Sequence, residues 1–533
     1  MTTDQRPGRD RRAVRVPAPA GRPRLTGTDG PPRVAVVGGG IAGLAAATVL
    51  AERGAHVVVC EREPYLGGRA GGWPTTLADG SQVTMTRGFH AFFRQYYNLR
   101  ALLRRADPAG TALVGLDDYP LWHAGGHEEG FAGLPRSTPW NAMGFLFRSP
   151  TFAWRDLAKV DARAALPLLN VSVPRTYQEL DALDAASYIN AIRFPPAAHA
   201  LAFEVFSRSF FAHPQDMSAA ELATMFHIYF LGSAEGLLFD VAADPFPHAL
   251  WDPLARYLTS LGTEVRTGTP VSVIGKGGPR RFEVHLGTGE PPIQADAVVL
   301  AADVGGLRRI VESSDELGGP EWRDHVGQLR NAPPFLVSRL WLDRPVRADR
   351  PGFLGTSGYD LLDNVSVLNH YEHEARAWAA RNNGAVVELH GYALPSGVDE
   401  AEGRERLITQ LHEVYPETTG ARIVDERHEL RQDCPLFPPG GHALRPGVRT
   451  PEDFLVLAGD LVRIDLPVAL MERAATTGFT AANLLLQRWG VAGTPLWSVP
   501  TSGRNPSLSA LARRFGRNPV PAQPTQRPVL RKV

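Results

Sequence analysis

The stretch that decides the fold is RVAVVGGGIAGLAAATVLAERGAHVVVCERE, residues 33–63. Its apolar run at 34–37 predicts a buried parallel strand, and the glycine-rich turn that follows opens a helix rich in alanine and leucine. That helix is expected to run to Arg53 and to stop at Gly54. A second strand over 57–60 ends at Glu61. This order of strand, turn, helix and strand predicts a dinucleotide-binding βαβ unit.

The glycine-rich turn matches the pattern G-x-G-x-x-G, and each glycine has a physical task. Gly38 permits the tight turn, Gly40 lets a pyrophosphate approach the backbone, and Gly43 lets the helix pack closely on the strand. Glu61 lies 23 residues after Gly38, where a carboxylate accepts from ribose hydroxyls and disfavours a 2′-phosphate. Because the first helical turn directs free N–H groups at the phosphates, the predicted phosphate-binding residues are Gly38, Gly39, Gly40, Ile41, Ala42 and Gly43.

Two further stretches carry the composition of a ligand-binding backbone. The run PYLGGRAGG at 64–72 contains Gly67 and Gly68, where the chain can approach a ligand closely, and Arg69, a forked donor suited to a phosphate. The run FLVLAGD at 454–460 predicts a buried strand that ends in Gly459 and Asp460, and a helix is expected over 471–489. A carboxylate at a strand end can accept from a ribose or another polyol.

The overall composition excludes several classes of protein. The chain has 533 residues, 56 basic and 56 acidic, so its net charge is zero, whereas nucleic-acid binding needs a basic surface. Hydrophobic residues make up 44% and charged residues 21%, as in a globular protein with a large core. Two cysteines, Cys60 and Cys434, cannot form a disulfide scaffold or a four-cysteine metal site, which favours a reducing compartment. We expect neither nucleic-acid binding nor a metal site.

The two ends of the chain are basic, and we expect no secretory signal in them. Residues 1–32 are rich in arginine, proline and glycine and lack an apolar core, so we expect a disordered tail. No run of 18 apolar residues predicts a membrane-spanning helix; the nearest, 222–239, predicts a buried helix followed by a turn. Residues 501–533 contain no acid, and Asn505 and Pro506 can start a helix there. That segment is either a loosely ordered tail or a short amphipathic helix lying on an anionic membrane.

The three motifs, in this order, resemble the FAD-dependent oxidoreductases of the amine oxidase and carotenoid desaturase superfamily. The resemblance spans 33–487 and implies FAD as the cofactor, extended between the three motifs. The run 269–274 is similar to the family's central strand, whose valine faces the adenine, and 296–302 to a further strand of the FAD domain. Beyond the phosphate-binding turn, the residues that the resemblance assigns to the cofactor here are Glu61, Arg62, Gly67, Gly68, Arg69, Val271, Gly459 and Asp460.

Further runs resemble one branch of this superfamily. GFHAFF at 88–93, YYN at 96–98 and MERA at 471–474 are similar to segments of plant-type phytoene and ζ-carotene desaturases. In that branch the first of these segments passes the flavin, which implies that Phe89, His90 and Met471 contact the cofactor. The longer runs 88–107, 202–212 and 220–237 most resemble actinobacterial carotenoid φ-ring synthases, also called isorenieratene synthases or β-carotene desaturase/methyltransferases.

The resemblance implies an activity in carotenoid biosynthesis. A β-ionone ring, with β-carotene as the expected substrate, would become aromatic through loss of about four hydrogens and an intramolecular 1,2-methyl shift. Hydride removal would start the reaction, and proton loss and a second oxidation would complete it. His90 and His213 could accept the proton, although each could equally be a satisfied core histidine, so we assign no catalytic side chain beyond the candidate His90. An electron acceptor, which the residues do not identify, would be required.

A polyene has no hydrogen-bonding groups, so its binding site must be apolar and aromatic. The expected lining residues are Phe93, Tyr97, Phe210, Phe211 and Tyr229, although each could instead belong to an ordinary core. Because such a substrate resides in a bilayer, we expect a peripheral, monotopic protein on the cytoplasmic side of a bacterial membrane. FLFR at 145–148, with Phe152 and Trp154, has a composition suited to that interface, or to a core.

The order of the motifs predicts the architecture. We expect an α/β fold, α+β overall, in which a Rossmann-like FAD/NAD(P)-binding domain is interleaved with a discontinuous substrate domain of mixed sheet and helices. The FAD-binding domain would comprise 33–110, 240–310 and 445–490, and the substrate domain 111–239 and 311–444. The expected tails are 1–32 and 491–533.

Three other functions are compatible with parts of this pattern. The nearest is a desaturase of acyclic phytoene or ζ-carotene. A flavin amine oxidase is disfavoured because the three lysines, Lys159, Lys276 and Lys532, are poorly placed and no cysteine adjoins the motif at 458–460. A lipid carrier similar to GDP-dissociation inhibitors, which lack functional flavin, is disfavoured by the intact nucleotide motifs.

Overall fold

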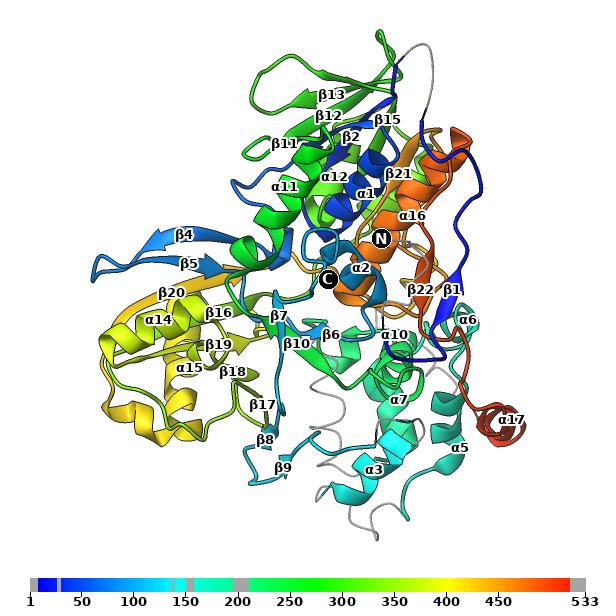
Figure 1. Ribbon diagram of the computed structural model, residues 1–533. Helices are drawn as coiled ribbons and strands as arrows, with labels where there is room; N and C mark the ends of the chain where they lie inside the picture. The colour runs from blue at the N-terminus through cyan, green and yellow to red at the C-terminus, as the bar shows by residue number, and fades with distance from the viewer. Residues whose placement is uncertain are drawn as a thin grey trace, which may run out of the picture.

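A five-stranded parallel sheet forms the upper part of the molecule (Figure 1). The computed structural model describes residues 8–25, 30–135, 137, 140–149, 158–194 and 210–517. The strand order is β11 (Glu264–Arg266), β3 (His56–Cys60), β2 (Arg33–Val37), β15 (Ala297–Leu300) and β21 (Leu455–Leu457), and each neighbouring pair is parallel. Three widely separated parts of the chain therefore contribute to one sheet.

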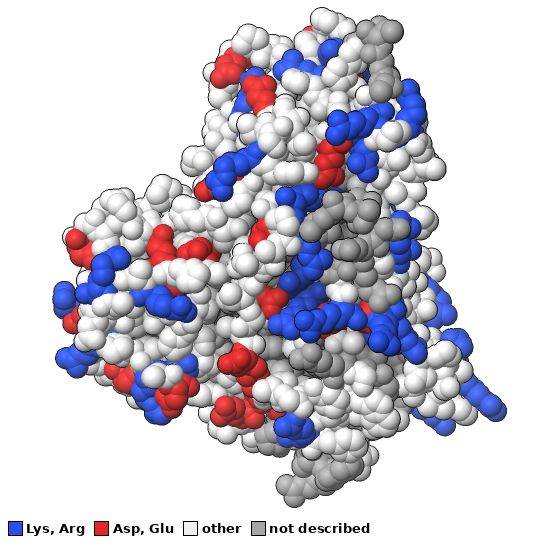
Figure 2. Space-filling model, viewed as in Figure 1, with Lys and Arg blue, Asp and Glu red and all other residues white. Residues whose placement is uncertain are grey.

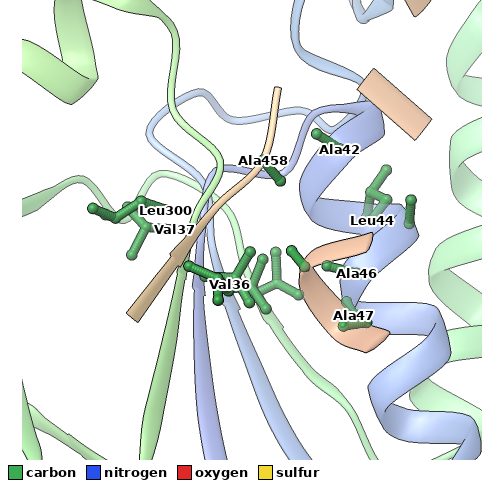
Figure 3. Close-up of a cluster of buried hydrophobic side chains, with 14 of the residues drawn as sticks. Val36, Val37, Ala42, Leu44, Ala46, Ala47, Leu300 and Ala458 are labelled. Carbon is green, nitrogen blue, oxygen red and sulfur yellow. The ribbon is translucent and has the colours of Figure 1, made fainter. Parts of the chain in front are cut away.

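Two helices from opposite ends of the chain pack together beside this sheet. In α1 (Ile41–Glu52) every residue except Glu52 is buried, because the helix is apolar on all sides. Small alanines let α1 contact α16 (Leu470–Arg488) closely, and Figure 3 shows the side chains of β2, α1 and the ends of β15 and β21 in this core. The predicted helices and strands of the three nucleotide-binding motifs agree with the observed ones to within one or two residues.

A seven-stranded mixed sheet forms a second layer, at the lower left in Figure 1. Its order is β20 (Ile423–Arg431), β16 (Phe335–Leu342), β19 (Ala385–Gly391), β18 (Asn364–Val367), β17 (Phe353–Ser357), β8 (Leu121–His123) and β9 (Glu128–Glu129). Its pairs are antiparallel except β17 with β8. Helices α14 (His373–Asn382) and α15 (Glu400–Val414) pack against it.

Smaller sheets connect the two layers. Strands β6 (Phe92–Phe93), β10 (Phe239–Ala242) and β7 (Leu113–Gly115) form one, and β4 (Gly72–Thr76) and β5 (Gln82–Thr86) form a hairpin. Strands β12 (Val271–Lys276), β13 (Phe282–Leu286) and β14 (Ile293–Ala295) form a separate antiparallel sheet. The prediction that 269–274 is a central strand is therefore wrong for the parallel sheet, because the chain turns away into this hairpin after β11 (Glu264–Arg266).

Short helices make up the third part of the molecule. They are α3 (Trp140–Arg148), α5 (Ala162–Ala165), α6 (Arg175–Leu180), α7 (Ala185–Ile192) and α10 (Ala219–Phe226), which continues into a π-helical stretch, His227–Leu231. The buried helix and turn expected over 222–239 are confirmed, and the turn ends at β10. The remaining helices of the described residues that matter below are α2 (Tyr97–Leu103), α12 (Val304–Glu312), α13 (Pro320–Gly327) and α17 (Pro506–Phe515).

The N-terminal segment departs from the expectation of a disordered tail. Residues Val14–Val16 form β1, which pairs antiparallel with β22 (Leu496–Ser498). Asp10 is buried, and its carboxylate accepts from Arg504 Nη1 at 2.6 Å and Nη2 at 2.9 Å. The expectation is wrong for residues 8–25 because backbone pairing and this ion pair fix them to the C-terminal part of the chain.

Charged side chains are interspersed over the face drawn in Figure 2, with basic side chains gathered near α2 and β6. There Arg94 and Arg100 both donate to the Asp240 carboxylate, and Arg105 donates to Glu52. Arginines of this region are thus matched by acids, as the zero net charge suggests. Over the residues that the structure describes, no helix is both long and apolar enough to span a bilayer. The predicted fold class, two interleaved parts built on a Rossmann-like sheet, is confirmed.

Candidate functional site

One cavity of about 640 Å³ begins at the carboxyl edge of the parallel sheet and extends between the mixed sheet and the short helices. At its nucleotide-binding end lies the turn between β2 and α1. Gly38 has a left-handed φ of 112°, and its N–H donates to the Cys60 carbonyl. A Cβ on Gly43 would lie 1.9 Å from the Gly38 carbonyl oxygen, so Gly43 keeps the helix start against the turn. No side chain caps the start of α1, which leaves this helix end to a ligand.

Glu61 closes the same turn from β3. Its Oε2 accepts from the Gly39 N–H at 2.6 Å and its Oε1 from the Glu63 N–H at 2.8 Å. Burial raises the pKa of Glu61, although these two backbone bonds oppose the shift. Glu61 lines the cavity and each carboxylate oxygen has a second lone pair, so the carboxylate both orders the glycine turn and faces a ribose position.

The second and third motifs meet at one ion pair. Arg69 Nη2 donates to Asp460 Oδ1 at 2.6 Å. Burial alone would lower the pKa of the Arg69 guanidinium, but the adjacent Asp460 raises it above its usual value. Gly67 reaches the first motif, since its N–H donates to the Gly39 carbonyl at 2.9 Å. Residues nearly 400 positions apart are thus held around one end of the cavity.

Most of the predicted cofactor residues line this cavity. Those that do are Gly38, Gly40, Ile41, Ala42, Glu61, Arg62, Gly67, Gly68, Arg69, Phe89, His90, Val271, Gly459, Asp460 and Met471. Gly39 and Gly43 lie behind the lining and shape the turn instead. The sequence reasoning missed the far wall of the nucleotide end, formed by Ala301, Ala302, Asp303, Gly306 and Arg309. The strand end at 300 marks this wall, since the carboxyl ends of parallel strands share one edge.

Aromatic side chains line the other part of the cavity. Phe89 stacks on Phe353 with ring centroids 4.2 Å apart, and Tyr119 contacts both Phe239 and Phe131 at 4.5 Å. Phe131 then stacks on Phe145 of α3 at 5.4 Å. Phe89 also contacts Phe239, with ring centroids 5.9 Å apart. Together these contacts form an almost continuous aromatic wall that runs from Phe89 to α3. Such a wall suits an apolar ligand.

The predicted substrate-lining residues divide into two groups. Phe93, Phe211 and Tyr229 line the cavity, and the Tyr229 hydroxyl lies 2.9 Å from that of Tyr96. Tyr97 and Phe210 are buried in a neighbouring hydrophobic cluster and do not line it. Tyr97 lies in the first turn of α2, which directs its ring away from the cavity. The spacing of aromatic residues in the sequence does not determine this direction.

Of the two candidate bases, His90 lines the cavity and His213 does not. His213 is exposed at the start of a short 3-10 turn. Burial lowers the pKa of His90 to about 4, and its Nδ1 lies 2.8 Å from the Gly88 carbonyl. His90 is therefore a neutral imidazole whose Nδ1–H donates to the Gly88 carbonyl. This favours a role in contacting the cofactor over a role as a general base. Cys434 also lines the cavity, but burial raises the pKa of its thiol to about 12, so it is not a nucleophile at neutral pH.

The runs YYN and MERA bind to each other. Glu472 accepts from the N–H groups of Asn98 and Leu99 at the start of α2, at 2.8 and 3.0 Å. The Asn98 amide also bonds with the backbone of Trp497 in both directions. Asn98 and Glu472 are buried, so these two runs fasten α2 to α16 and β22 and are structural.

Comparison with known proteins places this fold in a family. The flavin containing amine oxidoreductase family matches residues 41–486. The chain belongs to this family. It is 60% identical to the carotenoid phi-ring synthase of Streptomyces griseus, over 95% of this chain and 97% of that protein. It is 29% identical to the carotenoid phi-ring synthase of Chlorobaculum tepidum, over 89% and 91%. Cyclohexylamine oxidase from Brevibacterium oxydans shares the fold, with a TM-score of 0.62, 15% identity, and coverage of 86% of this chain and 99% of that one.

The residues present fit a flavin dinucleotide, and the protein is a flavin-dependent oxidoreductase. The uncapped start of α1 and the glycine cradle would hold the pyrophosphate, Glu61 a ribose, and Arg69 with Asp460 the region between phosphate and flavin. The aromatic wall begins where Phe89 and His90 line the cavity, so a flavin ring there would face an apolar ligand.

Proposed function

We propose that this protein is an FAD-dependent carotenoid φ-ring synthase that converts the β-ionone rings of β-carotene to aromatic rings with an intramolecular methyl shift. The observation that carries the proposal is the single cavity, in which the dinucleotide residues continue into an aromatic wall. The name of the relative that is 60% identical supports the same reading. Glu61 and Val271, which line the cavity on the expected adenosine side, support FAD rather than a mononucleotide.

The flavin, when bound, supplies the oxidation by accepting hydride from carbon. The chain's residues bind and orient the polyene and exclude water. Phe89, Phe353 and Phe239 would lie against the ring end, and Tyr119, Phe131 and Phe145 along the polyene. The reaction requires no protein nucleophile, since the methyl group would move within the substrate.

Expression in a bacterial host that accumulates β-carotene tests this function. The expected product keeps the carbon number and has about eight fewer hydrogens, four from each ring. The matched control is the same host with a Gly43→Ala chain, whose nucleotide turn is blocked. Unchanged β-carotene would contradict the proposal, and consumption of phytoene or ζ-carotene in another host would favour a desaturase instead. Release of AMP from the extracted cofactor by a phosphodiesterase would identify FAD.

The polyene would enter from a bilayer beside α3. On this helix Phe145 faces the cavity, whereas Trp140 is 60% and Phe147 59% exposed, with Met143 between them at 38%. The spacing 140, 143 and 147 puts these three side chains on one face. Phe152 and Trp154, also expected there, lie outside the described residues. The exposed apolar face of α3 adjoins the aromatic wall, so a water-insoluble ligand would have a short path from the bilayer to the cavity.

The C-terminal helix α17 supports the same peripheral docking. Asn505 caps it through bonds from the N–H groups of Ser507 and Leu508, as expected. It buries Ala512 and Ser509 and exposes Leu511 and Phe515 at 44% and 49%, and Arg513, Arg514 and Arg517 are also exposed. Figure 1 places α3 and α17 at the same lower end of the molecule. Exposed apolar side chains beside arginines suit an anionic lipid surface.

A further inference from the structure

A line of polar side chains lies on the inner face of the mixed sheet and reaches the wall of the cavity, close to its aromatic part. Glu388 and His390 alternate along β19, and Tyr392 follows directly after the strand. Side chains two residues apart point to one face of a strand, so the three lie in a row. His390 and Tyr392 line the cavity, whereas Glu388 is fully buried behind them.

The three side chains are joined by short contacts. Glu388 Oε1 lies 2.9 Å from His390 Nε2, and His390 Nδ1 lies 2.8 Å from the Tyr392 hydroxyl. Asn364, which pairs with His390 across β18 and β19, donates from Nδ2 to the Tyr392 hydroxyl at 3.1 Å. The row therefore ends in a phenol that is held from two sides and faces the cavity.

An arginine fixes the charge at the buried end of the row. Arg339, directly opposite Glu388 in the pairing of β16 with β19, donates to Glu388 Oε2 from Nε at 2.8 Å and from Nη2 at 2.6 Å. Burial would raise the pKa of Glu388, but Arg339 lowers it to about 2. Glu388 is thus a carboxylate throughout the neutral range and can only accept hydrogen bonds.

This charge decides the tautomer of His390. The Phe89 N–H also lies near Nε2, at 3.2 Å, but the contact with the charged Glu388 oxygen is shorter and charge-assisted. Nε2 therefore carries the proton and donates to Glu388, and Nδ1 accepts from the Tyr392 hydroxyl. Protonation of Nδ1 would produce an imidazolium next to a carboxylate, an arrangement that stabilises the added charge.

The flavin-facing segment packs directly on this imidazole. Gly88 has a left-handed φ of 94°, and a Cβ there would lie 2.6 Å from His390 Cε1. Phe89 and His90 follow, and both line the same cavity. The Tyr392 ring contacts Phe211 at 4.7 Å, which in turn contacts Phe335 at 4.8 Å. The hydroxyl is thus a polar group beside aromatic side chains, near the expected position of the substrate ring.

We propose that Tyr392, His390 and Glu388 form the proton relay that removes a ring proton after the first oxidation, before a second oxidation completes aromatisation, with Tyr392 as the catalytic base and the other two as positioning residues. The inference rests on the proposed function. After hydride removal and methyl migration, a ring C–H bond breaks and its electron pair becomes a ring double bond. The proton goes to the Tyr392 oxygen, while the Tyr392 proton goes to His390 Nδ1. Glu388 stays ionised and holds the resulting imidazolium until it releases the proton.

The experiment uses the purified flavin-loaded protein with β-carotene in detergent and an added quinone that reoxidises the flavin, and measures aromatic product against pH. Tyr392→Phe is expected to lower the rate of product formation by about 100-fold, the usual size of general-base catalysis, with flavin content and KM unchanged. The pH dependence of the rate should differ between the wild type and Tyr392→Phe, because the variant has no relay group facing the substrate. The charged and titratable groups next to His390 are Glu388, Tyr392, His90 and Asp363, and Arg339, Tyr371 and Glu372 surround Glu388 behind it.

Two controls separate a relay from a structural role. Tyr188→Phe removes a fully buried phenol that lies outside the cavity, and should leave the rate and its pH profile unchanged. His390→Asn should lower the rate as Tyr392→Phe does, and the double variant should lower it no further, because residues that act as a unit are not additive.

The outcomes distinguish this inference from the function on which it rests. A wild-type protein that leaves β-carotene unchanged contradicts the proposed function, and the relay falls with it. A wild-type protein that aromatises the rings, beside a Tyr392→Phe variant with the same rate and pH profile, overturns the relay alone. Additive losses in the double variant also overturn it. If Tyr392→Phe does not retain flavin, His390→Asn decides through the same pH profile.

Discussion

At the scale of single residues, Glu221 shows how a buried charge joins separate parts of the chain. Glu221 lies on α10, and its two carboxylate oxygens accept from Arg445 Nη1 at 2.8 Å and from Arg473 Nη2 at 2.7 Å. All three side chains are nearly inaccessible, at 2%, 6% and 2% exposure. Phe437 packs on both guanidinium groups. The carboxylate therefore ties α10 to α16 of the nucleotide-binding part.

We expect Glu221→Gln to lower the free energy of unfolding at neutral pH by about 3 kcal/mol, because it leaves two buried arginines without a counter-charge. Burial would raise the pKa of Glu221, but Arg473 and Arg445 lower it from 4.5 to about 2. The stabilisation is thus complete above pH 4.5 and is lost as pH falls toward 2. Urea unfolding of both proteins between pH 7 and pH 3 should show the difference narrowing with acidity.

The control for this change is Glu402→Gln, whose side chain is 53% exposed and pairs with Arg406. An exposed pair contributes little, so this variant should be within about 0.5 kcal/mol of the wild type. Equal effects of the two substitutions, or a Glu221→Gln deficit that does not shrink in acid, would contradict the account of Glu221.

At the scale of elements, the β2–α1 turn is set by a single close approach. A Cβ on Gly43 would lie 1.9 Å from the Gly38 carbonyl oxygen, and the two nearest atoms are backbone, which cannot move without breaking the turn. We expect Gly43→Ala to reduce bound flavin to less than about a tenth, since a loss above 1.4 kcal/mol in affinity is more than tenfold. The ratio of flavin to protein absorbance after purification measures this.

Gly327→Ala is the matched control for the turn. Gly327 lies in α13, no atom lies within 4 Å of its added Cβ, and alanine is the better helix former by about 1 kcal/mol. This variant should keep its flavin. A Gly43→Ala protein with full flavin content would show that the turn tolerates a side chain and that the nucleotide lies elsewhere.

The contrast between this turn and the polar row on β19 explains how far sequence reasoning reaches. The turn, Glu61 and Asp460 could be predicted because their chemistry is encoded in contiguous runs with fixed spacing. Arg339 and Glu388 meet only through the register of two strands, which no local pattern fixes. The alternation of Glu388, His390 and Tyr392 was visible as a period of two, but without the sheet nothing indicated that this face borders a ligand cavity. The prediction that Tyr97 lines the cavity was wrong for the converse reason, because a run of aromatic residues does not define which ring points into a cavity.

At the scale of the whole molecule, the aromatic wall and the exposed face of α3 require the cavity and the membrane to be considered together. Phe145 contacts Phe131 inside, while Trp140 and Phe147 on the same helix are exposed. The ion pair of Asp10 with Arg504 and the pairing of β1 with β22 join the N-terminal segment to the segment that carries β22 and α17. This ion pair holds the segment that leads into α17, and α3 is held separately by the bond from Asn141 Nδ2 to the Phe230 carbonyl at 2.6 Å.

We expect the double variant Trp140→Ser/Phe147→Ser to bind vesicles that contain anionic phosphatidylglycerol at least about tenfold more weakly than the wild type. Burying about 100 Å² of each ring contributes roughly 2.5 kcal/mol per ring at ~25 cal/mol/Å², and 1.4 kcal/mol is a factor of ten. Sedimentation with vesicles measures the bound fraction, and added salt should weaken binding further if Arg513 and Arg514 of α17 contribute.

Val14→Ser, which removes an exposed apolar side chain from β1, is the control and should bind as the wild type does. If the double variant still binds fully but a chain without residues 501–533 does not, the docking surface lies on α17 rather than on α3. If both changes leave binding intact, the peripheral docking proposed for these two helices is wrong, and the polyene must reach the aromatic wall by another route.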